Sequence, residues 1–211
     1  MSLVCRDSRV KAIVRRLGLI SFAVAILAVS PVRGQGRPVP VTDHDTPVQL
    51  MGFRIKPPTG SDWFWGLRDA QNVFFGKRLD SKTHSFVAVA FSRATSTSPS
   101  PDEFLEFARK FKAGAVDPSR NTIIEEEFVQ SSTPAPECVR YRFKLEDRGA
   151  PFAKGVALLQ EEFGFICLHP QSRKHFVDVR YSERGGPQPV SAQMREEGEA
   201  FLRGIEFTPV N

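Results

Sequence analysis

Hydrophobic residues recur at helical spacing in two parts of the chain. In the first, apolar side chains at i, i+3, i+4 and i+7 between Phe104 and Phe111 would share one face of a helix. The preceding Ser100-Pro101-Asp102-Glu103 has the form of a capping box with proline at the first helical position. Gly114 stands where a left-handed C-cap is expected. A second helix is predicted from about Ser191, with its apolar face formed by Met194, Phe201, Leu202 and Ile205.

Alternation of apolar and polar residues predicts strands in the rest of the chain. Over 138–145, the apolar residues Val139, Tyr141, Phe143 and Leu145 stand at every second position, which is typical of a strand with one polar face. Residues 85–91 are apolar on both faces, which predicts a central strand. Further strands are predicted at 51–56, 63–65, 72–75, 122–129, 154–160, 165–169 and 176–181. Of these, 154–160 and 165–169 are expected to be the arms of a hairpin around 161–164.

These elements predict a single α+β domain over residues 50–209. Strands joined by short turns favour a twisted antiparallel sheet, and two helices with one apolar face each are expected to cover it. About 160 residues suit one domain with one core. Residues 35–49 are rich in proline and polar residues and lack apolar periodicity, so they predict a flexible tether ahead of the domain.

Residues 1–34 have the layout of an export signal, a signal peptide. A basic stretch from Arg6 to Arg16 precedes an uncharged run, 17–30, whose 14 residues are fewer than the roughly 18–20 that a helix needs to cross a bilayer. Cleavage is expected between Ser30 and Gly34. The mature protein would then be periplasmic or extracellular, and it would contact a membrane only before cleavage. A twin-arginine signal at Arg15-Arg16 and an uncleaved single-pass anchor are the alternatives.

The positive charge of the chain belongs to this leader. The full chain has 29 Lys and Arg against 24 Asp and Glu, a formal net charge of +5. Six of those basic residues and one of the acidic residues lie within 1–34, so the mature chain carries no formal net charge. Because binding to a phosphate backbone needs a surplus of Lys and Arg, we expect no nucleic-acid partner.

Two cysteines follow the leader, Cys138 and Cys167. An even number of cysteines in an oxidising compartment favours a disulfide. The bridge would close a loop of about 30 residues and would contribute roughly 3–4 kcal/mol in the loop-entropy model. The alternative is two separate buried thiols that behave as small apolar side chains.

The order of several features resembles a known fold. A strand that stops at Pro57-Pro58, a turn followed by Trp63, a phenylalanine-rich central helix, a long antiparallel stretch and a closing helix are similar to the PsbP-like fold. The resemblance covers about residues 50–207 and extends to DcrB-type small exported bacterial proteins. It implies an α+β sandwich and a role in binding or assembly rather than in catalysis. No site motif is shared, so the resemblance implies no residue role.

The candidate catalytic residues lie near the last predicted strands. His169, Ser182 and Glu183 are the residues from which an unrecognised hydrolase site could be built, because a nucleophilic serine needs a base and an orienting group in contact with it. The chain has no Gly-x-Ser-x-Gly elbow. This secreted hydrolase is therefore the alternative function, and the favoured expectation is a protein that is not an enzyme.

The histidines are the candidate metal ligands of this chain. His169 and His175 flank a predicted turn, and a zinc site would need a third ligand such as Asp178 or Glu183. The six-residue spacing matches no standard ligand motif, and Arg173-Lys174 between the two histidines would repel a cation. We expect no metal and no cofactor.

The run Trp63-Phe64-Trp65 is the predicted binding patch. Three large rings in a row beside a turn cannot all point inward, so at least one is expected at or near the surface, where it suits a protein contact or an apolar ligand. The leading hypothesis is an exported, non-catalytic binding or assembly-accessory protein of the bacterial envelope. Its partner would be an envelope protein or a small apolar ligand. The sequence predicts no oligomeric state.

Overall fold

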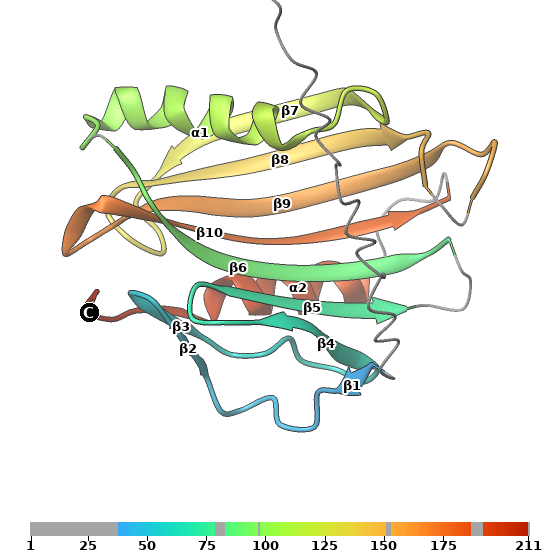
Figure 1. Ribbon diagram of the computed structural model, residues 1–211, viewed down its shortest axis with the longest axis horizontal. Helices are drawn as coiled ribbons and strands as arrows, with labels where there is room; N and C mark the ends of the chain where they lie inside the picture. Colours follow the sequence, from blue (N-terminus) through green and yellow to red (C-terminus); the bar gives the residue numbers. More distant parts are fainter. Residues whose placement is uncertain (1–37, 79–82, 97, 151–152, 187–191, 211) are drawn as a thin grey trace, which may run out of the picture. The chain divides into compact units, whose positions relative to one another are not determined.

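A computed structural model of the chain describes residues 38–78, 83–96, 98–150, 153–186 and 192–210. Its largest element is an eight-stranded antiparallel sheet with the strand order β1-β4-β5-β6-β10-β9-β8-β7 (Figure 1). The strands are β1 (Val39–Pro40), β4 (Trp63–Arg68), β5 (Asn72–Arg78), β6 (Ser85–Ala94), β7 (Asn121–Ser131), β8 (Cys138–Asp147), β9 (Leu158–His169) and β10 (Ser172–Gly185). The segment predicted to be a central strand is β6, which lies in the middle of this order. With its two helices, the domain is α+β, as predicted.

The large sheet separates two hydrophobic cores, because successive side chains of a strand point to opposite faces. On β6, Phe86, Ala88 and Ala90 belong to the first core, whereas Val89 and Phe91 pack in the second. The residues of β10 divide in the same way, with Val177, Val179 and Tyr181 in the first core and Phe176 in the second. The two faces of β6 and β10 therefore meet different partners.

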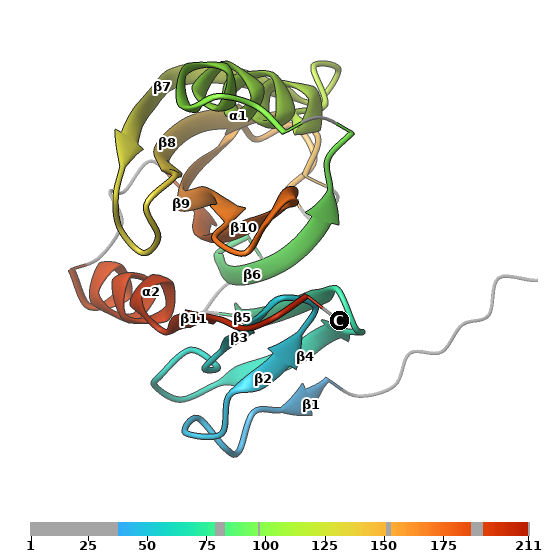
Figure 2. The same ribbon diagram turned by 90° about the vertical axis from the view of Figure 1, so that its left-hand side faces the viewer.

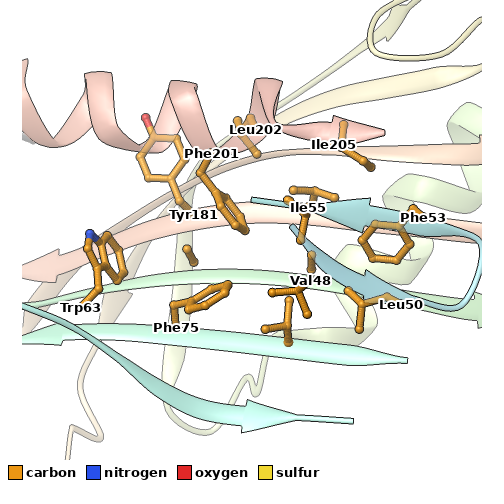
Figure 3. Close-up of a cluster of buried hydrophobic side chains, with 14 of the residues drawn as sticks. Val48, Leu50, Phe53, Ile55, Trp63, Phe75, Tyr181, Phe201, Leu202 and Ile205 are labelled. Atoms are coloured by element: carbon orange, nitrogen blue, oxygen red, sulfur yellow. The ribbon is translucent and has the colours of Figure 1, made fainter. Parts of the chain in front are cut away.

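The first core joins the large sheet to a second, three-stranded sheet (Figure 3). This sheet has the order β11-β3-β2 and consists of β2 (Val48–Leu50), β3 (Phe53–Ile55) and β11 (Ile205–Phe207). Helix α2 (Ala192–Arg203) contributes Met194, Phe201 and Leu202 to the same core. The helix predicted from about Ser191 is thus present, but Ile205 lies in β11, beyond its end.

The second core contains helix α1 (Pro101–Ala115), which lies within the curve of the strands from β7 to β6 (Figure 2). Its predicted capping box is confirmed. The Ser100 side chain accepts a hydrogen bond from the Glu103 backbone N–H at 3.4 Å, and the Glu103 carboxylate accepts one from the Ser100 N–H at 2.7 Å. The predicted left-handed cap at Gly114 is wrong. The helix runs on to Ala115, and Val116 leaves it in an extended conformation while packing against the second core.

The predicted turn at 161–164 is also wrong, because these residues lie inside the uninterrupted strand β9. The polar pair that suggested a turn is held by neighbours on both sides of the sheet. Glu161 pairs with Arg142, and Glu162 pairs with Lys112. Each of these two glutamates therefore has an oppositely charged partner, from the neighbouring strand for Glu161 and from helix α1 for Glu162.

The predicted tether, residues 35–49, is part of the domain from Pro38 onward. β1 pairs with β4, β2 pairs with β3, and Val41 and Val48 are buried. Single valines between prolines and polar residues show no periodicity, so only their tertiary partners reveal that this segment is ordered. Residues 35–37 and the predicted leader, 1–34, lie outside the described residues.

Cys138 and Cys167 form the predicted disulfide. They stand directly opposite each other on β8 and β9, and both are buried. The bridge therefore joins two strands that are already hydrogen-bonded neighbours. In the described part of the chain, neither helix has the length and apolar character needed to cross a membrane.

Candidate functional site

Trp63, the first residue of the predicted patch, is buried and is only 3% exposed. Its indole Nε1 donates to the Thr59 carbonyl oxygen at 2.9 Å and lies 3.2 Å from Glu197 Oε2. The Lys77 ammonium group lies 5.6 Å from the ring centroid and 3.0 Å from Glu197 Oε2. Trp63 thus anchors β4 to α2 in the first core (Figure 3).

The other two rings of the patch are half-buried and do not share a surface. Trp65 packs against Phe75 with ring centroids 4.7 Å apart, on the side of the first core. The Phe64 ring lies over Gly76, where a Cβ atom would be 2.5 Å from the ring. Consecutive strand residues point to opposite faces. The structure therefore does not bring Trp63, Phe64 and Trp65 together on one face.

The residues of the predicted hydrolase site are also separated. His169 is 1% exposed, and its Nε2 lies 2.8 Å from the Gly52 carbonyl oxygen and 2.9 Å from that of Thr208. Ser182 pairs in register with Glu162, seven residues along β9 from His169, which corresponds to roughly 23 Å. Glu183 points to the opposite face and contacts His84. A serine, base and orienter in mutual contact are thus not assembled from these three residues.

The two candidate metal ligands, His169 and His175, have other partners. His169 holds the backbone at Gly52 and Thr208, as described above, and His175 Nδ1 lies 2.9 Å from the Ser172 hydroxyl oxygen. Within the described ranges, no group of three or more His, Cys, Asp or Glu side chains is placed to hold a metal ion.

An open hollow of about 580 Å³ lies on the face of the sheet opposite the first core, over β5, β6 and β10. We call it the groove. Its floor on β6 is Val87, Val89 and Phe91, and Leu67 and Phe74 add apolar surface from the neighbouring strands. Val87 and Val89 are half-buried and Leu67 is 53% exposed, so apolar surface is accessible here. The polar part of the lining is Asn72, Ser85, Arg93, Gln160, Glu162, Arg180, Ser182 and Arg184.

The strand register explains why one side of the groove is apolar and the other polar. Val87 stands opposite Ser182, and Val89 stands opposite Arg180. Ser85 stands opposite Arg184 at one end of the same row. Since opposite residues of an antiparallel pair share a face, β6 supplies the apolar strip and β10 supplies the polar strip. The groove is thus amphipathic across its width.

A buried ionic network supports the middle of the groove. The Lys112 ammonium group from α1 pairs with Glu162 and lies 3.6 Å from Asp178 Oδ2. Arg180 Nη1 donates to Asp178 Oδ2 at 2.8 Å, and Arg180 Nε lies 3.6 Å from Glu162 Oε2. The Tyr141 hydroxyl donates to Asp178 Oδ1 at 2.8 Å and accepts from Lys112 at 3.0 Å. Each charge in this network therefore has an opposite charge beside it.

The network holds its members in defined protonation states. Burial raises the pKa of Tyr141 well above its usual range, and the nearby carboxylates of Asp178 and Glu162 raise it further. Burial opposes the charge of Arg180, but the carboxylates of Asp178 and Glu162 more than offset this and hold the pKa of Arg180 above its usual value. Tyr141 therefore stays a neutral donor and Arg180 stays a cation.

A second ion cluster lies at the end of the groove that contains Arg184. Arg120 Nη2 and Arg184 Nη1 lie 2.5 and 3.3 Å from the same oxygen, Asp147 Oδ2. The hydrogen bond from Arg120 and the backbone N–H of Gly149 lower the pKa of Asp147, against the effect of its burial. Gln160, Glu162 and Arg180 line both the groove and a neighbouring hollow of about 270 Å³ beside α1. The two hollows thus share one polar wall.

Sequence reasoning missed this groove. The signal was the alternation on 176–185, where Asp178, Arg180, Ser182 and Arg184 stand at every second position. The pattern showed a strand with one polar face, but it did not show that Val87 and Val89 lie beside that face. That pairing is made by residues about ninety positions apart in sequence.

Comparisons with known proteins add little to this geometry. No protein-family model matches the chain, and no curated protein matches it. Among solved structures, the Ran-binding protein Mog1p of Saccharomyces cerevisiae is similar to this chain, with 11% sequence identity and a TM-score of 0.39. The match covers 78% of this chain and 95% of Mog1p. A similarity at this TM-score assigns neither a fold family nor a function, so the resemblance to PsbP-like and DcrB-type proteins stays a prediction.

Proposed function

We propose that this chain is an exported, non-catalytic binding protein that holds a small amphiphilic ligand in the groove. The observation that carries the proposal is the division of the groove into an apolar strip on β6 and a polar strip on β10. Ligand sites in proteins are typically hollows of roughly 300–1,000 Å³ that combine apolar walls with a few placed polar groups. The groove, at about 580 Å³, has that size and that composition.

Export is the second part of this proposal. The basic stretch and apolar run of residues 1–34 support it, as does the Cys138–Cys167 disulfide, since disulfides persist in oxidising compartments. N-terminal sequencing of protein recovered from the periplasm or medium of a bacterial host tests it. We expect a new terminus between Ser30 and Gly34, and an intact Met1 would contradict export with cleavage.

We also propose that the domain is a PsbP-like α+β sandwich with the two helices covering the sheet. The placement of α1 residues in one core and α2 residues in the other supports this arrangement. An experimental structure with the helices on the same face would contradict it.

Native mass spectrometry of the full chain, purified without detergent from its expression host, tests the binding function. We expect a fraction of the protein to carry a small added mass that denaturation releases. Val87→Glu places a charge on the apolar floor and should abolish the added mass. Val129→Glu is the matched control. Val129 is 52% exposed and lies on β7, an edge strand of the large sheet that is separated from β6 by three strands.

Two results would contradict the binding function. One is the absence of added mass on the wild-type chain, and the other is the same added mass on the Val87→Glu chain. Circular dichroism of both variants shows whether the fold is intact.

A further inference from the structure

We propose that the ligand of the groove is a single-chain alkyl amphiphile with an anionic head group, a carboxylate or a phosphate, which lies at Arg184 and Arg180 while the hydrocarbon tail lies along β6. This inference rests on the proposed function and specifies the ligand class of the same site.

The charge of the groove favours an anion. The described side chains that line the groove and the neighbouring hollow include five cations, Arg93, Lys112, Arg120, Arg180 and Arg184. Three carboxylates pair with four of them, those of Asp147, Glu162 and Asp178. Two positive charges are left over, which favours a ligand with an anionic head group.

Arg184 is only weakly paired within the protein. Its one hydrogen bond to the described residues runs from Nη1 to Asp147 Oδ2 at 3.3 Å, and Asp147 is held more closely by Arg120 at 2.5 Å. Arg184 Nε is buried and has no hydrogen-bond partner in the described part of the chain. A guanidinium group presents paired donors that match the two oxygens of a carboxylate. A head group in the groove would therefore add a partner to the exposed part of the Arg184 side chain, which is 25% exposed.

Arg180 lies on the same face of β10, four residues from Arg184, with Ser182 between them. Each arginine side chain is 25% exposed, so both reach the groove. The pair forms one polar end for a ligand, and the apolar strip begins directly beside it, since Val89 is the cross-strand partner of Arg180.

The tail is accommodated by Val87 and Val89, and this strip ends at the buried ring of Phe91, over which Arg93 and Arg180 lie. Val87, Val89 and Phe91 stand at every second position of β6 and span roughly 13 Å. Phe74 stands opposite Val89 on β5 and widens the strip. An unbranched hydrocarbon chain fits such a straight, shallow surface, and it buries apolar area that the free protein exposes.

The test uses ligands that share a ten-carbon tail and differ in the head group. Decanoate, decanol, decyltrimethylammonium and decyl phosphate are titrated into the full chain by calorimetry, below their micelle concentrations. We expect decanoate and decyl phosphate each to bind at least ten-fold more tightly than decanol and decyltrimethylammonium. In the Arg184→Gln variant, the affinity for decanoate should fall about ten-fold, whereas the affinity for decanol should be unchanged. The matched control is Arg54→Gln, because Arg54 is exposed on the second sheet and pairs with Glu206.

Several results would overturn this inference while leaving the binding function in place. They are equal affinity for decanoate, decyl phosphate and decanol, or no effect of Arg184→Gln, in each case with binding lost in Val87→Glu. No binding of any ten-carbon ligand, together with an added mass in native mass spectrometry that Val87→Glu removes, would also overturn it. Failure of the binding function is distinguished by the absence of an added mass on the wild-type chain.

Discussion

The Tyr141 hydroxyl donates to Asp178 Oδ1 at 2.8 Å, on the face of the sheet that packs against α1. Both residues are buried, and Tyr141 also accepts a hydrogen bond from Lys112. One phenolic oxygen therefore connects a helix cation to a strand carboxylate. Gly164 makes the approach possible, because a Cβ atom there would lie 2.6 Å from the Tyr141 oxygen.

Replacing this hydroxyl should destabilise the protein. Tyr141→Phe removes one partner each from buried Asp178 and Lys112, and we expect a loss of about 1–3 kcal/mol in the free energy of unfolding. Tyr181→Phe is the matched control. The Tyr181 hydroxyl is buried without a hydrogen-bond partner among the described residues, so its removal should leave stability unchanged or raise it slightly. Urea denaturation of both variants measures this, and equal losses would contradict the network.

Asp147 should make stability depend on pH in the acid range. Its folded pKa is lowered, first by the hydrogen bond from Arg120, so the folded state favours the carboxylate more than the unfolded chain does. This contribution is fully present above the unfolded pKa of about 3.9 and is lost as pH falls through the lower folded pKa. Asp147→Asn should lower the free energy of unfolding by about 2 kcal/mol at pH 7. The variant should also lose less stability than wild type between pH 5 and the acid limit. Parallel pH curves for the two proteins would exclude this role.

Gly198 lies in helix α2, and its replacement by alanine should not stabilise the protein. A Cβ atom there would lie 2.4 Å from the Tyr181 ring, so we expect Gly198→Ala to cost about 1–3 kcal/mol. In α1, a Cβ at Gly114 would meet no atom within 4 Å, and Gly114→Ala should raise stability by about 0.5–1 kcal/mol through helix propensity. Thermal unfolding of the two variants should therefore shift in opposite directions. A stabilised Gly198→Ala would show that α2 does not pack closely on Tyr181.

Replacement of Trp63 by alanine should destabilise the protein much more than replacement of Trp65. Trp63→Ala opens a cavity in the first core and releases the partner of Thr59, so we expect a loss of about 3–5 kcal/mol. Trp65 is half-buried at the edge of the same core, and Trp65→Ala should cost clearly less. Chemical denaturation monitored by fluorescence of the remaining tryptophan compares them. Similar losses would contradict the placement of Trp63.

The disulfide should contribute to stability without being required for the strand pairing. Replacing Cys138 and Cys167 with alanine removes a bridge between residues 29 positions apart, for which we expect a loss of about 2–4 kcal/mol. Far-ultraviolet circular dichroism should stay close to that of the wild type, because β8 and β9 form nine residue pairs in addition to the bridged one. An unchanged midpoint in denaturant would mean that the bridge does not constrain the unfolded chain.

Local patterns predicted several elements correctly, because neighbouring residues alone determine them. The capping box at Ser100 and Glu103 depends on side chains three positions apart, and the apolar character of 85–91 reflects the central place of that strand, with one face buried in the first core and the other half-buried. The Cys138–Cys167 bridge is predicted because only two cysteines follow the predicted leader. The turn at 161–164 was wrong because the partners of Glu161 and Glu162 come from β8 and α1.

The sequence by itself determined the α+β class, the first helix with its cap, the central strand and the disulfide pair. Only the tertiary structure decided which side chains meet on a face. It buried Trp63 under α2, separated His169 from Ser182, and placed Val87 and Val89 of β6 beside Arg180 and Arg184 of β10. The physical reason is that strand periodicity tells which residues share a face within one strand, whereas the partner strand and its register are set by packing between segments far apart in the chain.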